Sequence, residues 1–360
     1  MNQLIAFQGL ITASTWVLTY AVHSFVAHGA ALLSGRYLVR SPRYRSALYR
    51  AAFLLPVLTA TALTAGVRPF TPIAEINVAE LARQKPGTGP TEVLVTQRVR
   101  LTGSGKRSID SFATDSTALR IAFGATGLAA LAALFGLVGQ ARRYLAFRDR
   151  LGARKKVVTA DVQRDGAYQL TASSTLGAPV ALGLREICVP DQTFESLTAE
   201  ERRSVIAHEA AHLARRDPLW FAISDAIVAL FPWQPLARLL SREARRTAEF
   251  CCDDAVVESV GHGRALVRSL ATFAAGFDPA ETAFAASCGG SPLEERARRL
   301  LGPAGGDIRR LGRWAVALAL LLLVAVVSVA PAVSTRSKPE QLRHPDMMRR
   351  MVIEEVDTTR

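Results

Sequence analysis

Two histidines, His208 and His212, stand four residues apart in the stretch VIAHEAAHLARRD at residues 205–217. On a helix, positions i and i+4 lie on one face a turn apart, so both imidazoles would point to the same place. Imidazole is a common zinc ligand, and Glu209 could hold a water molecule without itself binding the metal. The spacing predicts a metal site suited to hydrolysis. The alternative is a pair of ordinary helix histidines beside a solvated glutamate.

A hydrolytic zinc site takes three protein ligands and leaves a fourth position for water. Candidates for the third ligand lie in the stretch EFCCD, where Glu249 and Asp253 share a helix face. We expect Glu249 to bind the metal, because a carboxylate leaves zinc more Lewis-acidic than a thiolate would, and Cys252 is the rival ligand. Asp253 is expected to accept a hydrogen bond from a ligand histidine. His262 is a candidate donor to the negative charge that develops on a substrate carbonyl.

The first of the two helices that must position these side chains is bounded by clear signals. Thr198 and Glu201 have the spacing of a capping box, and Pro218 prevents the helix from continuing. These residues predict a helix over 199–216.

The second helix is predicted over 235–260, with a proline in its first turn and a glycine just beyond its end. Between the two helices, the segment 219–233 is apolar but too short to span a bilayer comfortably, and Asp225 interrupts it. It is predicted to be either a core helix or a helix lying in the membrane interface. Upstream, residues 167–190 are rich in Val, Leu, Thr and Ile and predict two or three short strands.

The chain is 49% apolar, and much of this content lies in four stretches without Asp, Glu, Lys or Arg. These stretches are residues 3–33, 51–67, 121–141 and 314–335. Each is long enough, or nearly so, to cross a hydrocarbon core of about 30 Å as a helix. Buried core helices are the alternative, but the fourth stretch is apolar on every face. The sequence therefore predicts four transmembrane helices.

Lysine and arginine are enriched in cytoplasmic loops, which fixes the expected orientation. The segments 34–50 and 142–156 are strongly basic and are assigned to the cytoplasm, and the first apolar stretch is a retained anchor because no basic residue precedes Arg36. All four cysteines fall in the region assigned inside, so no disulfide is expected. The predicted divisions are membrane helices 1 and 2 with a short basic loop (1–67), an outer loop (68–117), membrane helix 3 (118–141), a cytoplasmic domain (142–313), membrane helix 4 (314–335) and an outer tail (336–360).

The formal net charge of +13 raises the question of nucleic-acid binding. The basic residues cluster at the membrane borders and are not interleaved with aromatic residues, so attraction to anionic lipid headgroups is the better explanation. We expect a lipid bilayer and a protein substrate as partners and no direct contact with nucleic acid. A homo-oligomer is compatible with the sequence.

The motifs HEAAHLARRD, FPWQPLARLL and EARRTAEFCCDDAVV resemble peptidase family M56, which includes the BlaR and MecR antibiotic sensor-transducers. The resemblance covers about residues 1–335, with its specific motifs in 205–257. It implies a gluzincin-type zinc site with His208, His212 and Glu249 as ligands and Glu209 as general base. Those sensor-transducers carry a penicillin-binding domain after the last membrane helix, whereas 25 residues follow here, so a role as β-lactam receptor is not expected.

The fold expected from these observations is a mainly α multi-pass membrane protein, with a cytoplasmic gluzincin-like α+β peptidase domain between membrane helices 3 and 4. The expected activity is zinc-dependent endopeptidase cleavage of a cytoplasmic or membrane-proximal protein, in signal transduction or regulated proteolysis at the inner membrane. Candidate substrates are a transcriptional repressor and the chain itself. Two alternatives are a quality-control protease similar to family M48 and a non-catalytic signalling scaffold with structural zinc.

Overall fold

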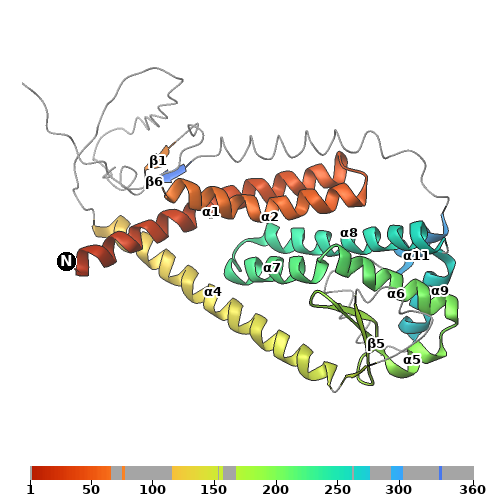
Figure 1. Cartoon of the computed structure of the whole chain (residues 1–360). Helices are drawn as coiled ribbons and strands as arrows, with labels where there is room; N and C mark the ends of the chain where they lie inside the picture. The colour runs from red at the N-terminus through yellow and green to blue at the C-terminus, as the bar shows by residue number, and fades with distance from the viewer. Residues whose placement is uncertain are drawn as a thin grey trace, which may run out of the picture.

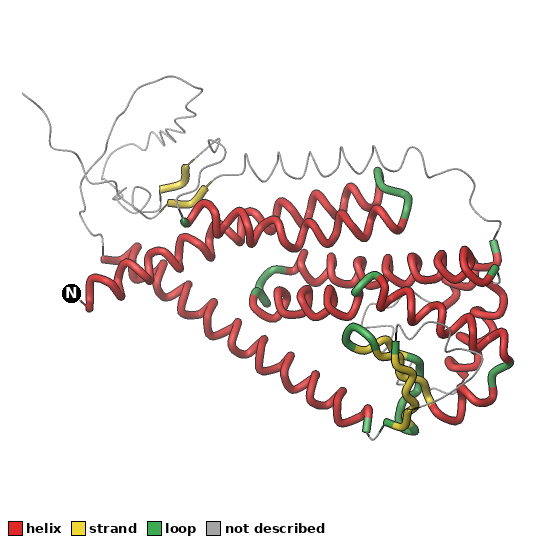
Figure 2. Tube along the Cα trace, in the orientation of Figure 1, coloured by secondary structure: helices red, strands yellow, loops and turns green. Residues whose placement is uncertain are grey.

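The computed structural model describes residues 2–65, 75–77, 116–152, 154–156, 168–261, 263–275, 293–302 and 332–334. Within them the chain is mainly helical (Figures 1 and 2). The helices are α1 (Asn2–Tyr37), α2 (Pro42–Thr64), α4 (Ser116–Leu151), α5 (Asp191–Ser196), α6 (Ala199–Ala214), α7 (Asp217–Leu230), α8 (Pro235–Val260), α9 (Gly263–Ala275) and α11 (Leu293–Leu301). The strands are β1 (Glu75–Asn77), β2 (Lys155–Lys156), β3 (Gln169–Ser173), β4 (Val180–Leu182), β5 (Glu186–Pro190) and β6 (Ala332–Ser334).

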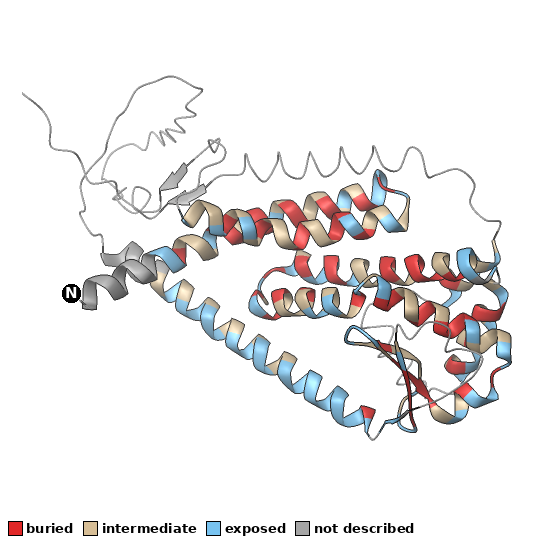
Figure 3. Cartoon of the chain, viewed as in Figure 1, coloured by how far each residue is buried: buried red, intermediate tan, exposed pale blue. Residues whose placement is uncertain are grey.

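Three described helices are long and apolar enough to cross a membrane: Thr12–Tyr37 of α1, all of α2, and Phe123–Leu151 of α4. They coincide with the first three predicted spans. The fourth predicted span, apart from its end at β6, lies outside the described residues, as does most of the predicted outer loop. Figure 3 shows α4 exposed along almost all of its described length. Leu128, Leu134 and Phe135 project from it into the surroundings, as expected of side chains that face lipid.

The second span begins earlier than its apolar run. The basic stretch before residue 51 was predicted as a loop, but α2 starts at Pro42 and only residues 38–41 connect it to α1. Proline fits the first turn of a helix, and arginine is a good helix former, so the arginines extend the apolar helix instead of interrupting it. As a result Arg50 lies on a membrane helix, in its third turn.

A four-stranded sheet packs with α6. The strand order is β2-β3-β5-β4, with β3 and β5 parallel and the outer pairs antiparallel. A core cluster joins this sheet to α5, α6 and α9, with Ile187, Val205 and Phe273 among its buried members. Helix α6 begins with the predicted capping box, in which the Thr198 hydroxyl accepts from the backbone N–H of Glu201. The sheet and this cap fix the helix that carries both site histidines.

A separate core cluster joins α7 and α8 to α1 and α2. Its buried residues come from α1, α2, α7, α8 and the α7–α8 turn. The rings of Tyr20 on α1 and Phe231 in the turn stack with centroids 3.8 Å apart, and the Gln234 amide donates to the Ser24 hydroxyl at 2.9 Å. The α7–α8 turn therefore lies beside the middle of α1.

Helix α7 buries Ser224, Ile227 and Ala229 against protein and leaves Leu219 and Leu230 exposed, so both predicted alternatives, a core helix and an interfacial helix, stay open. It packs between α4 and α8, and the Gly136 Cα lies so close to the Ala229 carbonyl that no side chain fits there. Asp225 is not free in an apolar surrounding, because it pairs with Arg245 at 2.6 Å and accepts from the Gln140 amide at 3.4 Å. The charge of Asp225 is therefore paired with groups of the protein.

This arrangement predicts that lipid covers the tip of α7. Leu230 is 37% exposed in the protein alone, yet it precedes a turn that contacts the middle of α1. A cysteine at this position should label slowly or not at all with a membrane-impermeant thiol reagent in opened membrane fragments, because hydrocarbon disfavours the reactive thiolate. Arg203→Cys, on the exposed face of α6, is the control and should label rapidly. The four native cysteines are first changed to alanine. Equal labelling at both positions would show that α7 stands clear of the bilayer.

Candidate metal centre

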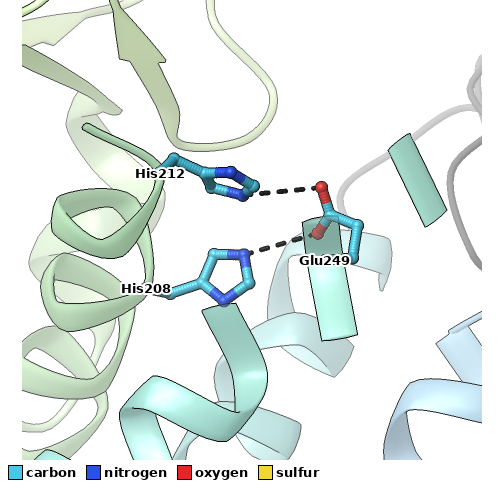
Figure 4. A group of neighbouring side chains, drawn as sticks. All are labelled: His208, His212 and Glu249. Atoms are coloured by element: carbon cyan, nitrogen blue, oxygen red, sulfur yellow. Dashed lines mark ion pairs between the residues drawn. The ribbon is translucent and has the colours of Figure 1, made fainter. Parts of the chain in front are cut away.

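The three predicted ligands come together between α6 and α8 (Figure 4). Helix α6 presents His208 and His212 one turn apart, and α8 presents Glu249 opposite them. The Nε2 atom of His208 lies 3.4 Å from Glu249 Oε2, and the Nε2 atom of His212 lies 3.5 Å from Glu249 Oε1. One nitrogen or oxygen from each residue lies within 4.8 Å of the others.

These separations fit a single tetrahedral zinc ion. With zinc to nitrogen or oxygen bonds of about 2.0–2.1 Å, two ligand atoms of a regular tetrahedron lie about 3.4 Å apart. The two distances between imidazole nitrogen and carboxylate oxygen are close to that value, and each joins a different oxygen of Glu249, Oε2 for His208 and Oε1 for His212. Both histidines are buried and Glu249 is partly exposed, so the cluster is shielded by protein on the histidine side and reachable on the other.

Each histidine has an acidic partner at its other ring nitrogen. His212 Nδ1 lies 2.9 Å from Asp217 Oδ2 in a hydrogen bond. His208 Nδ1 lies 3.2 Å from Asp253 Oδ1, at an angle poor for a hydrogen bond. A carboxylate behind an imidazole fixes the tautomer and leaves Nε2 with its lone pair toward the metal. Asp253 therefore lies where the sequence predicts the partner of a ligand.

Sequence reasoning did not identify Asp217. It begins α7, is fully buried, and lies five residues after His212, directly before the proline that was used only as a helix stop. The available signal was an acid at the junction of the two helices, where the chain turns back past the end of α6. An aspartate near the first turn of a helix is also favoured by the helix dipole.

Cys252, the rival ligand, lies on the other side of His212. Its thiol is 3.8 Å from Asp217 Oδ2, and it groups with His212 and Asp217 rather than with His208 and Glu249. Burial raises the pKa of the Cys252 thiol to about 11, although the neighbouring imidazole opposes the shift. Its place beside Asp217, outside the group of His208, His212 and Glu249, is the geometric reason to favour Glu249 as the third ligand.

Many of the side chains in this site are charged. Burial by itself would raise the pKa of Glu249, but the contacts with both imidazoles and with Arg296 outweigh it and hold that pKa well below its usual range. Glu249 is therefore an anion, as a metal ligand must be. Burial would lower the pKa of His212, yet the hydrogen bond to Asp217 and the contact with Cys252 outweigh it and raise that pKa.

Arg296 on α11 is a second residue that the sequence did not indicate. Its guanidinium donates to Asp253 at 2.6 and 3.0 Å, and its Nη1 atom lies 3.0 Å from Glu249 Oε2. One of its nitrogens also lies 3.4 Å from His208 Nε2. Arg296 thus places a fixed positive charge at the edge of the cluster. His262, the predicted donor to the developing oxyanion, lies outside the described residues.

Glu209 follows His208 on α6 and is only 8% exposed. A buried acid that directly follows one histidine of a possible metal cluster in the sequence is typical of a site for metal-assisted hydrolysis. Together with the long apolar helices, it defines the class of membrane-associated metallopeptidases.

The comparison with family models gives the same result. The model of the BlaR1 peptidase M56 family matches residues 30–297, which run from α1 to α11, and the chain belongs to this family. The resemblance stated from the motifs is thereby confirmed. Among curated proteins no match is found.

Proposed function

We propose that this protein is a zinc-dependent endopeptidase of the inner membrane, acting in regulated proteolysis with its site on the cytoplasmic side. The observation that carries the proposal is the cluster of His208, His212 and Glu249, whose spacing suits one tetrahedral zinc ion. A zinc ion held there supplies Lewis acidity, which makes water nucleophilic near neutral pH and polarises a peptide carbonyl.

The chain's own residues supply the proton transfers. Glu209 accepts the proton of the attacking water and returns it to the nitrogen of the leaving amine. Asp217 and Asp253 hold the two imidazoles in place while this occurs. Arg296 contributes positive charge close to Glu249, which would help to stabilise negative charge that develops on a substrate carbonyl.

The substrate class follows from where the site lies. The turn after His212 contacts Arg50, close to the basic end of α2, and this contact supports a site near the membrane surface. A cytoplasmic or membrane-proximal protein segment would reach it. A transcriptional repressor and the chain itself are the two candidates.

Purified full-length protein in detergent should carry about one zinc ion per chain and cleave an unfolded protein such as casein. A chelator should stop the cleavage and added zinc should restore it, because the attacking water must be bound at the fourth coordination position of the zinc ion. Elemental analysis measures the zinc, and gel electrophoresis follows the cleavage. A chain purified without zinc, or cleavage that persists after the metal is removed, would contradict the proposed function.

A further inference from the structure

The turn between α6 and α7 is fastened to membrane helix α2. From α2, the Arg50 guanidinium donates to the backbone carbonyl of Arg215 at 3.2 Å and to the Asp217 carboxylate. In the opposite direction, the Arg215 guanidinium donates to the Ser46 hydroxyl at 2.8 Å. Two consecutive turns of α2 thus contact the segment 215–217, which begins three residues after His212.

The backbone of this turn shows why an outside contact matters. Arg216 has φ of 56°, the one positive value among the described residues other than glycine. A residue with a Cβ pays a conformational cost in the left-handed region and stays there only when its surroundings hold it. The contacts from α2 provide such surroundings.

Asp217 links these contacts from α2 to the metal cluster. Its side chain is fully buried, and a buried carboxylate is tolerated only when cations and hydrogen bonds surround it. One oxygen bonds His212 Nδ1 at 2.9 Å and Arg215 Nε at 3.1 Å, while the other faces Arg50. Arg50 is itself held over the ring of Trp220, with its central carbon 5.1 Å from the centroid.

We propose that Arg50 of membrane helix α2 is a positioning residue for the metal centre, acting through Asp217 on the imidazole of His212. The inference rests on the proposed function, because it takes His212 as a zinc ligand. Loss of the Arg50 guanidinium would leave Asp217 without one of its partners and loosen the hold of Asp217 on His212.

The test measures zinc affinity by competition with a chromophoric chelator, using the full chain in lipid nanodiscs. Arg50→Met should weaken zinc binding about tenfold, at the lower end of the roughly 10- to 100-fold loss typical when a partner of a metal ligand is removed. Arg50→Lys, which keeps the charge but lacks the planar fork of donors that a guanidinium presents, should recover part of the loss. Arg45→Met is the matched control, because Arg45 lies on the same helix but donates to the Val39 carbonyl, and it should bind zinc as the wild type does.

A double-mutant cycle with Asp217→Asn shows whether Arg50 acts through that carboxylate. If it does, adding Arg50→Met to Asp217→Asn should cause no further loss of zinc affinity. In the cobalt-substituted protein, both single variants should shift the visible absorption bands in the same direction, because both loosen the same ligand.

Wild-type affinity in Arg50→Met, an equal loss in Arg45→Met, or a double variant whose loss is the product of the two single losses would each overturn the inference. Failure of the wild-type chain to bind zinc would instead overturn the proposed function, so the two failures are distinguishable. If Arg50→Met does not fold, Arg50→Lys and Asp217→Asn still decide: equal affinity to wild type in both would refute the link.

Discussion

Replacing Glu209 with glutamine should abolish peptidase activity while leaving zinc bound. Glutamine has the shape of glutamate and keeps hydrogen-bonding capacity, so the buried surroundings of this side chain tolerate the change. Its neutral amide cannot accept a proton from water, and loss of a general base costs about 10²- to 10⁴-fold in rate. Since Glu209 is not one of the three clustered ligands, the zinc content should stay near one per chain.

The measurement is cleavage of casein together with elemental analysis of the same sample. Glu200→Gln is the matched control, because it makes the same chemical change on the same helix at a side chain that is 41% exposed. It should keep full activity. Turnover that survives in Glu209→Gln would mean that another group is the base, and zinc lost from that variant would mean that Glu209 is itself a ligand.

The second large effect is expected at the third ligand. Glu249→Ala should weaken zinc binding by roughly 1000-fold or more, beyond the 10- to 100-fold typical of partners outside the metal, because two imidazoles remain where three ligands are needed. Cys252→Ser should keep zinc, since the thiol lies behind His212 beside Asp217 and not at the Nε2 side that faces Glu249.

His212→Ala provides the reference for complete loss of a ligand in this experiment. Thermal unfolding of each variant, followed in detergent, separates loss of the metal from loss of the fold. If Cys252→Ser released zinc more readily than Glu249→Ala, the metal would sit in the group of His212, Asp217 and Cys252 instead.

The cluster of candidate ligands was predictable because each part of it is local. His208 and His212 share one helix, Glu249 stands on a second helix with clear start and stop signals, and helical periodicity fixes which residues share a face. Local patterns could not show that the two helices lie side by side. That inference came from the number of protein ligands that zinc requires.

The residues behind the ligands were not predictable in the same way. Arg50 and Asp217 are 167 positions apart, and Arg296 and Asp253 are 43 apart. In the sequence Arg50 is one of several arginines near a membrane border, where topology alone explains it. Nothing local distinguishes the arginine that contacts a buried carboxylate from those that face headgroups or water.

The nature of α7 was likewise set by distant partners. Its apolar residues fit a core helix and an interfacial helix equally well, because hydrophobic periodicity says which side is covered but not by what. The structure shows which protein groups cover one side of α7: Phe231 meets Tyr20 of α1, and Asp225 meets Arg245 of α8. Pro42, by contrast, was a local signal for the start of α2 that the arginines after it concealed.

The core cluster that α1 and α2 share with α7 and α8 makes the folding of α7 and α8 depend on the membrane insertion of α1 and α2. A ribosome completes α1 and α2 long before it reaches α7, so the surface that receives the later helices is already in the bilayer when they emerge. A fragment beginning at residue 142 would leave Ile227, Phe231 and Leu240 uncovered in water and Asp217 without Arg50. Chains that miss the membrane would thus lack the contacts that hold α7, α8 and the candidate metal centre together.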